Sequence, residues 1–145
     1  MNDVFIYKKD GAMNIIYLTG LVPIQEYMEN YLDKENEYHV FDKTSLPNIN
    51  YIKAWDFNDD KTAVIVNMPK ARDIHRTALR SDRVPRLATL DVAYMRALER
   101  GDSTAAQEIA AQKQTLRDIP AHPAIDAAQT PEELMALTLD VLLTQ

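Results

Sequence analysis

The aromatic residues and the arginines of this chain lie in different halves, and this segregation constrains the fold more than any other feature. Ten of the eleven aromatic residues lie within 1–68, which contains no arginine, while all eight arginines and one aromatic residue, Tyr94, lie within 69–145. Aromatic side chains favour strands, whereas alanine, arginine and glutamine favour helices. We therefore expect an α+β fold with two domains, a small α+β module over 1–68 and a helical module over 69–145.

Length and composition exclude several classes of protein. A chain of 145 residues suits one ordinary domain or two very small ones. Its apolar runs are far shorter than the roughly 18 residues of a membrane helix, and its first lysines follow a short apolar run, the reverse of a signal peptide. We expect a soluble protein with no membrane partner, not secreted by a signal peptide. Cysteine is absent, which excludes disulfides and thiolate metal sites.

The first half contains a strong hairpin signal close to its start. The segments 4–7 and 13–18 are rich in β-branched and aromatic residues. Between them lies the dipeptide Asp10-Gly11, which supplies the positive φ that a tight turn requires. The sequence therefore predicts two antiparallel strands joined at this turn.

A helix and a second hairpin follow in the same half. Pro23 stands where a first helical residue would, and apolar residues then recur at the spacing of one helix face, which predicts a helix over 23–32. The segments 53–57 and 62–67 flank a polar turn and predict the second hairpin. We expect the two hairpins to form one four-stranded sheet with the helix on one face.

The second half has helical periodicity almost throughout. A helix over 70–82 is followed by Pro85, which should kink or restart it, because proline has no backbone N–H. Apolar residues at spacings of three and four then predict a helix over 84–98 that ends at Gly101. The turn after it is so short that the next helix must return antiparallel. The side chains expected to stabilise this helical hairpin are Leu87, Leu90, Leu98, Ile109 and Leu116.

The remaining segments have recognisable helix starts. The returning helix begins at 102–104, where Thr104 and Gln107 have the spacing of a capping box, and it runs to Pro120. A proline-marked connector over 120–129 follows. A second capping signature follows, formed by Thr130, the proline after it and Glu133. It predicts a terminal helix over 130–142.

No catalytic, cofactor-binding or metal-binding motif is present in the sequence. His39, His75 and His122 are far apart, and the three glycines permit neither a GxGxxG sequence nor a P-loop. The acidic turn at 56–60 lacks the glycine and distant glutamate of an EF-hand and indicates a solvated hairpin turn. We predict no catalytic residue, no cofactor and no metal. A deep pocket that gathers His39 or His75 with a carboxylate would instead favour a small hydrolase.

The arginines Arg72, Arg76, Arg80 and Arg83 form a basic stripe, because spacings of four, four and three place them on one helix face. Pairing with acidic residues of the chain or of another subunit, together with solvation, is the leading interpretation. A protein partner comes second and nucleic acid third. The net charge of −6 and the pI near 5.0 argue against a general nucleic-acid binder.

Apolar residues on the helix over 84–100 predict a protein interface. Tyr94, Met95 and Leu98 cannot all face one antiparallel neighbour, so part of this helix should contact another chain. We expect a homo-oligomer or docking on a symmetric partner, with arginines as a polar rim. The predicted interface residues are Arg86, Leu87, Tyr94, Met95, Arg96, Leu98 and Arg100.

A succession of short motifs runs through the second half. The segments are IHRTALRSDRVPRLATLDV at 74–92, YMRALERGD at 94–102, IAAQKQTLRDIP at 109–120 and TPEELMAL at 130–137. Over about 68–140 the chain thereby resembles a helical region of many small bacteriophage proteins that are encoded among tail and tail-fibre genes. These proteins are described as tail proteins or tail-fibre assembly chaperones. The tryptophan and tyrosine expected before the L-R-D segment in such chaperones are absent here.

The resemblance implies a non-enzymatic protein that acts through contacts with other phage tail or fibre proteins. The expected role is a tail or tail-fibre attachment subunit of the virion, or a factor in its assembly. The alternatives are an assembly chaperone absent from the mature particle and an accessory DNA-binding module that uses the basic stripe. The expected location is the virion tail, or the host cytoplasm during phage assembly.

Overall fold

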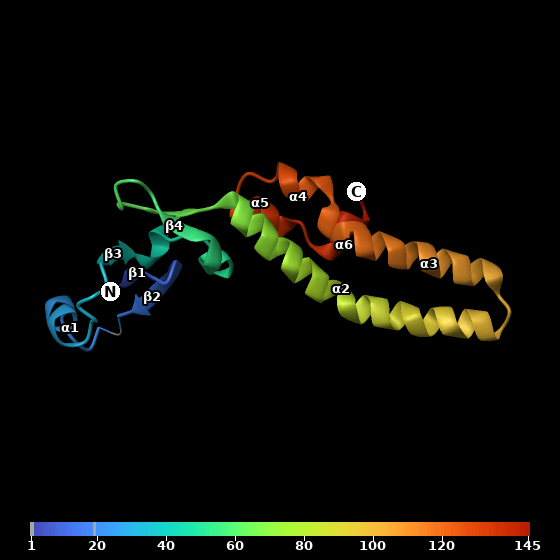
Figure 1. Ribbon diagram of the computed structural model, residues 1–145, viewed down its shortest axis with the longest axis horizontal. Helices are drawn as coiled ribbons and strands as arrows, with labels where there is room; N and C mark the ends of the chain where they lie inside the picture. The colour runs from blue at the N-terminus through green and yellow to red at the C-terminus, as the bar shows by residue number, and fades with distance from the viewer. Residues whose placement is uncertain (1, 19) are drawn as a thin grey trace. The chain divides into compact units, whose positions relative to one another are not determined.

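The chain is divided into two compact units, Met1–Ala71 and Arg72–Gln145, in a computed structural model that describes residues 2–18 and 20–145 (Figure 1). Small antiparallel sheets lie in the first unit, and the second is helical. The α+β class predicted from the sequence is thus confirmed. Among the described residues, no helix combines the length and apolarity needed to cross a membrane.

The first hairpin forms as predicted, with a longer first strand and a second strand that begins one residue earlier. Strand β1 (Asp3–Lys9) pairs antiparallel with β2 (Ala12–Tyr17), and Val4 lies opposite Tyr17. Asp10 and Gly11 have φ values of 52° and 79°. A two-residue turn with both central residues in this left-handed region matches the twist of the strands that it joins.

A third strand, which the sequence analysis missed, changes the sheet. Strand β3 (Tyr38–Asp42) pairs antiparallel with the free edge of β1, giving the order β2-β1-β3. The second hairpin is present as β4 (Trp55–Phe57) and β5 (Val64–Val66), but it forms a separate two-stranded sheet. The predicted four-stranded sheet is therefore wrong, because β3 takes one edge of β1 and the two hairpins do not share a ladder.

Strand β1 is buried on both faces, which organises the first unit. Val4 and Ile6 belong to a buried cluster with Trp55 of the second hairpin. Phe5, on the other face, is fully buried and its ring stacks on Tyr27 at 6.0 Å between centroids. Helix α1 and the β4–β5 hairpin thus contribute to opposite sides of the central strand.

Helix α1 (Ile24–Asn30) is shorter than expected and starts one residue later. Pro23 was predicted to be the first helical residue. Its ψ of 144° shows that it instead precedes the helix. Two short 3-10 helices, η1 (Lys43–Ser45) and η2 (Ile49–Ala54), connect β3 to β4. The Trp55 indole N–H donates to the Asn48 carbonyl at 3.2 Å, which satisfies the one polar atom of this buried ring.

Helix α2 (Met68–Glu99) continues through Pro85, so of the two outcomes predicted there, a kink or a restart, the restart is wrong. Proline removes only one helical hydrogen bond, and Ser81, whose carbonyl would have accepted it, is exposed to water. Figure 1 shows that the ribbon of α2 changes direction near its middle, as expected when the solvent-facing side of a helix opens at a proline.

Helix α3 (Ser103–Asp118) returns antiparallel to α2, which confirms the predicted helical hairpin (Figure 1). Gly101, at φ of 69°, ends the preceding turn. The capping residue is Asp102, whose carboxylate accepts from the Ala105 N–H at 3.0 Å. Thr104 therefore does not cap this helix, because the aspartate before it already occupies the capping position.

The segment after α3 is more helical than expected. The predicted connector holds η3 (Ile119–Ala121) and α4 (Pro123–Ala127), and the predicted terminal helix is divided into α5 (Pro131–Ala136) and α6 (Leu139–Leu143). The predicted cap is confirmed, since the Thr130 hydroxyl accepts from the Glu133 N–H at 3.2 Å. A second cap at Thr138 starts α6 and accounts for the division. The large buried side chains of this unit are Leu79, Leu116, Ile119, Ile125, Leu134, Leu139 and Leu142.

Candidate functional site

A row of apolar side chains runs along α2 and is exposed to solvent. We call it the apolar stripe, and it consists of Val84, Ala88, Val92, Met95 and Leu98. Its members are three or four residues apart, so they fall within an arc of about 120° on the helix surface, which also contains the exposed Asp91 and Glu99. The exposed fractions are 60% for Val84, 52% for Val92, 56% for Met95 and 49% for Leu98. About half of each large side chain thus stays in water.

A different face of α2 packs within its own unit. Leu79 and Ala97 are buried on this face, and Leu87, Leu90 and Tyr94 are half-buried. Because consecutive residues lie about 100° apart around a helix, the burial of Ala97 turns the next residue toward solvent. Helix α2 therefore has two apolar faces, and the unit covers one of them.

Alanines near Gly101 and one lysine farther along α3 connect the two helices of the hairpin. Ala97 of α2 and Ala106 of α3 are buried there. The Lys113 ammonium lies 2.5 Å from the Asp91 carboxylate and 5.1 Å from the centre of the Tyr94 ring. Two alanines and one ion pair bury little apolar surface between the two helices.

The structure places the apolar members of the predicted interface on both faces of α2. Met95 and Leu98 lie in the apolar stripe, whereas Leu87 and Tyr94 are half-buried on the side that packs within the unit. The expectation that Leu98 stabilises the hairpin is wrong, because half of this side chain is exposed. Val84 and Val92 were not among the predicted interface residues, although their spacing from Met95 indicates the same helix face.

The arginines of the predicted interface also differ in their surroundings. Arg96 and Arg100 are exposed beside the stripe. Arg86 instead contacts Asp140 of α6, with 2.7 Å between guanidinium and carboxylate. This ion pair lowers the pKa of Asp140, and it ties the C-terminal helix to α2.

Arg72 and Arg83 of the basic stripe donate to backbone carbonyls of the second unit. Arg72 donates to the Ala128 carbonyl at 2.7 Å. Arg83 donates to the carbonyls of Leu116 and Arg117 at 3.3 and 2.5 Å. The last carbonyls of a helix lack partners within the helix, so Arg83 satisfies the end of α3.

The other two arginines of the stripe contrast with each other. Arg76 donates to the Pro120 carbonyl at 3.1 Å and lies 2.6 Å from Asp126 and 3.3 Å from Asp73. Its bond to Asp126 raises the pKa of this guanidinium. Arg80 is exposed and has no ion pair or hydrogen bond from its guanidinium within residues 2–18 and 20–145. The stripe is thus largely committed to contacts within its own unit.

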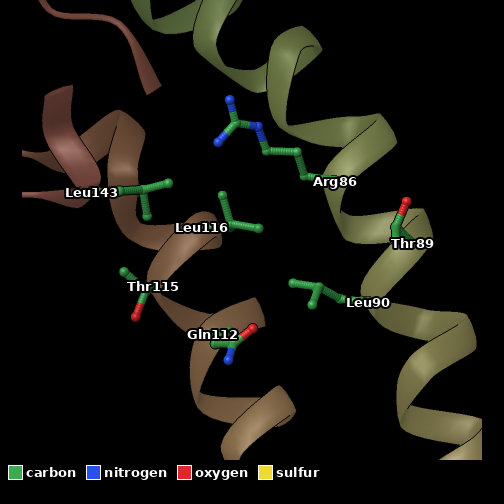
Figure 2. Close-up of a pocket in the computed structure, with 7 residues that line it drawn as sticks. All are labelled: Arg86, Thr89, Leu90, Gln112, Thr115, Leu116 and Leu143. Atoms are coloured by element: carbon green, nitrogen blue, oxygen red, sulfur yellow. The ribbon is translucent and has the colours of Figure 1, made fainter. Parts of the chain in front are cut away.

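A mostly apolar cavity of about 420 Å³ lies between α2 and α3 (Figure 2). Figure 2 shows Leu90 of α2 and Leu116 of α3 directed into this space, with Leu143 of α6 at its end. Arg86 lies at the same end, where its guanidinium pairs with Asp140. The residues that line the cavity are Arg86, Thr89, Leu90, Gln112, Thr115, Leu116 and Leu143.

The histidines are placed by local contacts in different parts of the chain. The Nε2 atom of His75 lies 3.0 Å from the Leu137 carbonyl, and His122 accepts a backbone N–H at the start of α4. His39 lies 3.4 Å from the carboxylate of Glu37. Within the part of the chain that the structure describes, no group of three histidine, aspartate or glutamate side chains has the geometry of a metal site.

The acidic turn of the second hairpin uses its carboxylates to shape the loop. Asp60 accepts from the backbone N–H and the hydroxyl of Thr62 at 3.2 and 2.6 Å, and these bonds lower its pKa. Asp56 pairs with Lys8 of β1 at 3.0 Å. Both carboxylates thus have protein partners.

Comparisons of this chain with protein-family models, curated proteins and solved structures find no match.

Proposed function

We propose that this protein is a non-enzymatic component of a bacteriophage tail region that works through contacts with other tail or fibre proteins. The observation that carries this proposal is the apolar stripe on α2, in which four large side chains each keep about half of their surface exposed. Scattered exposed apolar residues are normal, whereas several gathered on one helix face, as here around the exposed Asp91, are typical of an interaction surface. The tail context rests on the sequence resemblance.

The surroundings of the stripe are those of a protein interface. Arg96 follows Met95 and Arg100 follows the last residue of α2, and both are exposed charged groups near one end of the apolar row. Interfaces combine an apolar centre with a polar rim, and arginine is frequent in them. Because the hairpin holds its own helices together through the opposite face, the stripe is available to a partner without unfolding of the unit.

Two roles fit this function, and they differ in whether the protein is present in the mature particle. A tail or fibre-attachment subunit stays in the particle in stoichiometric amount, whereas an assembly chaperone leaves it. Quantitative mass spectrometry of purified phage particles separates these roles. A fixed copy number per particle supports the subunit. Absence from particles, together with a stable complex with a fibre protein in the infected cell, supports the chaperone. Absence from both contradicts the proposal.

A substitution within the stripe tests whether this surface makes the contact. Met95→Lys places a charge in the centre of the row, and an exposed side chain tolerates it with little cost to folding. We expect incorporation into particles, or recovery in the fibre complex, to fall at least tenfold. Ile65→Lys, at a side chain of the first unit that is 47% exposed, is the matched control and should retain both. Equal incorporation or recovery of Met95→Lys and Ile65→Lys would show that the apolar stripe does not make the contact.

A further inference from the structure

We propose that a phosphate-type oxoanion binds in a second cavity of the C-terminal unit, at the end of α3. This cavity has a volume of about 400 Å³ and is lined mainly by arginines. We call it the arginine cavity, and its charged lining consists of Arg76, Arg80, Arg83, Arg117 and Asp126. Three of these arginines come from successive turns of α2, and Arg117 comes from the last turn of α3.

Two of the four guanidinium groups form fixed walls. Arg76 is held by the Pro120 carbonyl and by Asp126, and only 20% of its side chain is exposed. Arg83 is held by the carbonyls of Leu116 and Arg117. The negative end of the α3 dipole would repel an anion at this position, and the charge of Arg83 offsets it. The cavity is therefore preorganised before any ligand arrives.

The other two guanidinium groups have unused donors. Arg80 and Arg117 are exposed, and neither guanidinium has a hydrogen bond or ion pair among the described residues. A guanidinium presents five N–H donors in a planar fork that fits the oxygens of phosphate or sulfate. Two such forks beside one cavity can bind a single tetrahedral anion from two sides.

The charge at the cavity is strongly positive although the chain is acidic overall. Four guanidinium groups and one carboxylate line it, which is an excess of three positive charges. Counting Asp73, which pairs with Arg76 from outside the lining, still leaves an excess of two. The net charge of the chain is −6. This local concentration of positive charge attracts anions.

The shape of the cavity favours a small anion over a nucleic-acid duplex. A volume of about 400 Å³ is that of a small-molecule site. The lining contains no aromatic side chain on which a base could stack. Two of its arginines are already bonded to carbonyls, so they cannot turn outward to follow a phosphate backbone. The ligand is therefore a free phosphate or a phosphoryl group on a small molecule.

Titration of inorganic phosphate into the full-length chain tests this proposal. At constant ionic strength, maintained with sodium chloride, we expect saturable shifts of arginine and amide NMR signals with a Kd on the order of 1 mM. Sulfate should compete. The Arg80→Gln/Arg117→Gln double variant should weaken binding at least tenfold. The Lys9→Gln/Lys34→Gln variant removes two exposed positive charges from the first unit and should leave Kd unchanged.

Three outcomes would overturn the site. One is an absence of saturable binding up to about 50 mM phosphate. Another is a loss of phosphate affinity in the Lys9→Gln/Lys34→Gln control as large as that in the double arginine variant. This result would show that binding follows only the net charge of the chain. The third is tight, salt-sensitive binding of duplex DNA without binding of free phosphate, which would return the basic stripe to the nucleic-acid interpretation. Circular dichroism of each variant confirms that the helices are retained, so that loss of binding is not loss of fold.

Discussion

The two units bury apolar surface in different ways. In the first, three consecutive residues of β1, Val4, Phe5 and Ile6, are almost fully buried, and large aromatic rings cover both faces of the strand. In the second, burial is spread over single leucines, isoleucines and alanines from α2 to α6. Truncation of a side chain in β1 should therefore lower the stability of the first unit more than truncation of a single, partly exposed side chain lowers the stability of the second.

The difference also explains where the exposed apolar surface lies. A strand in the middle of a sheet can be covered on both sides by its own unit, as β1 is. A long helix paired with one other helix is covered on one side only. Helix α2 has apolar residues on more than that side, so the apolar stripe remains free for another protein.

The largest expected effect is that of Phe5→Ala. This substitution removes a fully buried ring that stacks on Tyr27, and it should cost about 3 to 5 kcal/mol of the first unit's stability. Trp55 is the one tryptophan of the chain and is buried in this unit, so its fluorescence reports the unfolding of the first unit. Far-ultraviolet circular dichroism reports mainly the helices of the second.

In urea, the fluorescence transition of Phe5→Ala should move to lower concentration, while the helical transition stays in place. This would separate the two units thermodynamically, as the segregation of aromatic residues and arginines predicts. A common shift of both signals would show one cooperative fold and would break the comparison.

The next effect distinguishes two leucines of the second unit. Leu134 is fully buried, and Leu134→Ala should cost about 2 to 5 kcal/mol. Leu98 is 49% exposed, and Leu98→Ala should change stability by less than about 0.5 kcal/mol. Thermal unfolding at low protein concentration checks both. A cost above about 2 kcal/mol for Leu98→Ala would place this side chain in the hairpin core and remove it from the stripe.

Local signals in the sequence were sufficient for some elements. The Asp10-Gly11 turn and the Thr130 cap depend on residues within a few positions of each other, and both were predicted. Strand β3 was missed because its main partner, β1, lies more than thirty positions earlier, and a short segment shows its strand character only when it pairs. Of the two outcomes predicted at Pro85, a kink or a restart, the restart does not occur, because the cost of the proline depends on whether water reaches the freed carbonyl.

Only part of the apolar stripe was predicted, because the covered face of a helix depends on its neighbours in the fold. Met95 and Leu98 were singled out from the spacing of apolar residues, together with Leu87 and Tyr94. Periodicity shows that a helix has apolar residues on several sides, but it does not show which side the neighbouring helix covers. Arg117 was not connected with the arginines of α2, since the turn that brings them to one cavity is a tertiary feature.

A smaller effect is expected for Arg76, which tests whether ionic contacts support the second unit as aromatic packing supports the first. Arg76→Met keeps most of the aliphatic stem but leaves the Pro120 carbonyl and Asp126 without their partner. Charge-assisted bonds of a partly buried group predict a loss of about 1 to 3 kcal/mol. Asp126→Asn retains an acceptor and should cost less. Equal stability of wild type and Arg76→Met would show that these bonds merely replace hydration.

The smallest effect concerns the ion pair between Lys8 and Asp56 in the first unit. The bond from Lys8, more than that from the Phe57 N–H, holds the pKa of Asp56 below its ordinary value. A carboxyl with a lowered pKa in the folded state stabilises the fold above its ordinary pKa, and this contribution is lost as the pH falls through the lowered value. Lys8→Met should therefore raise the pKa of Asp56 part of the way back, because the Phe57 N–H still donates. The cost at neutral pH should stay below about 1 kcal/mol, since both side chains are about 40% exposed. A carboxyl NMR titration of wild type and variant measures the shift, and an unchanged pKa of Asp56 would show that this pair does not persist in solution.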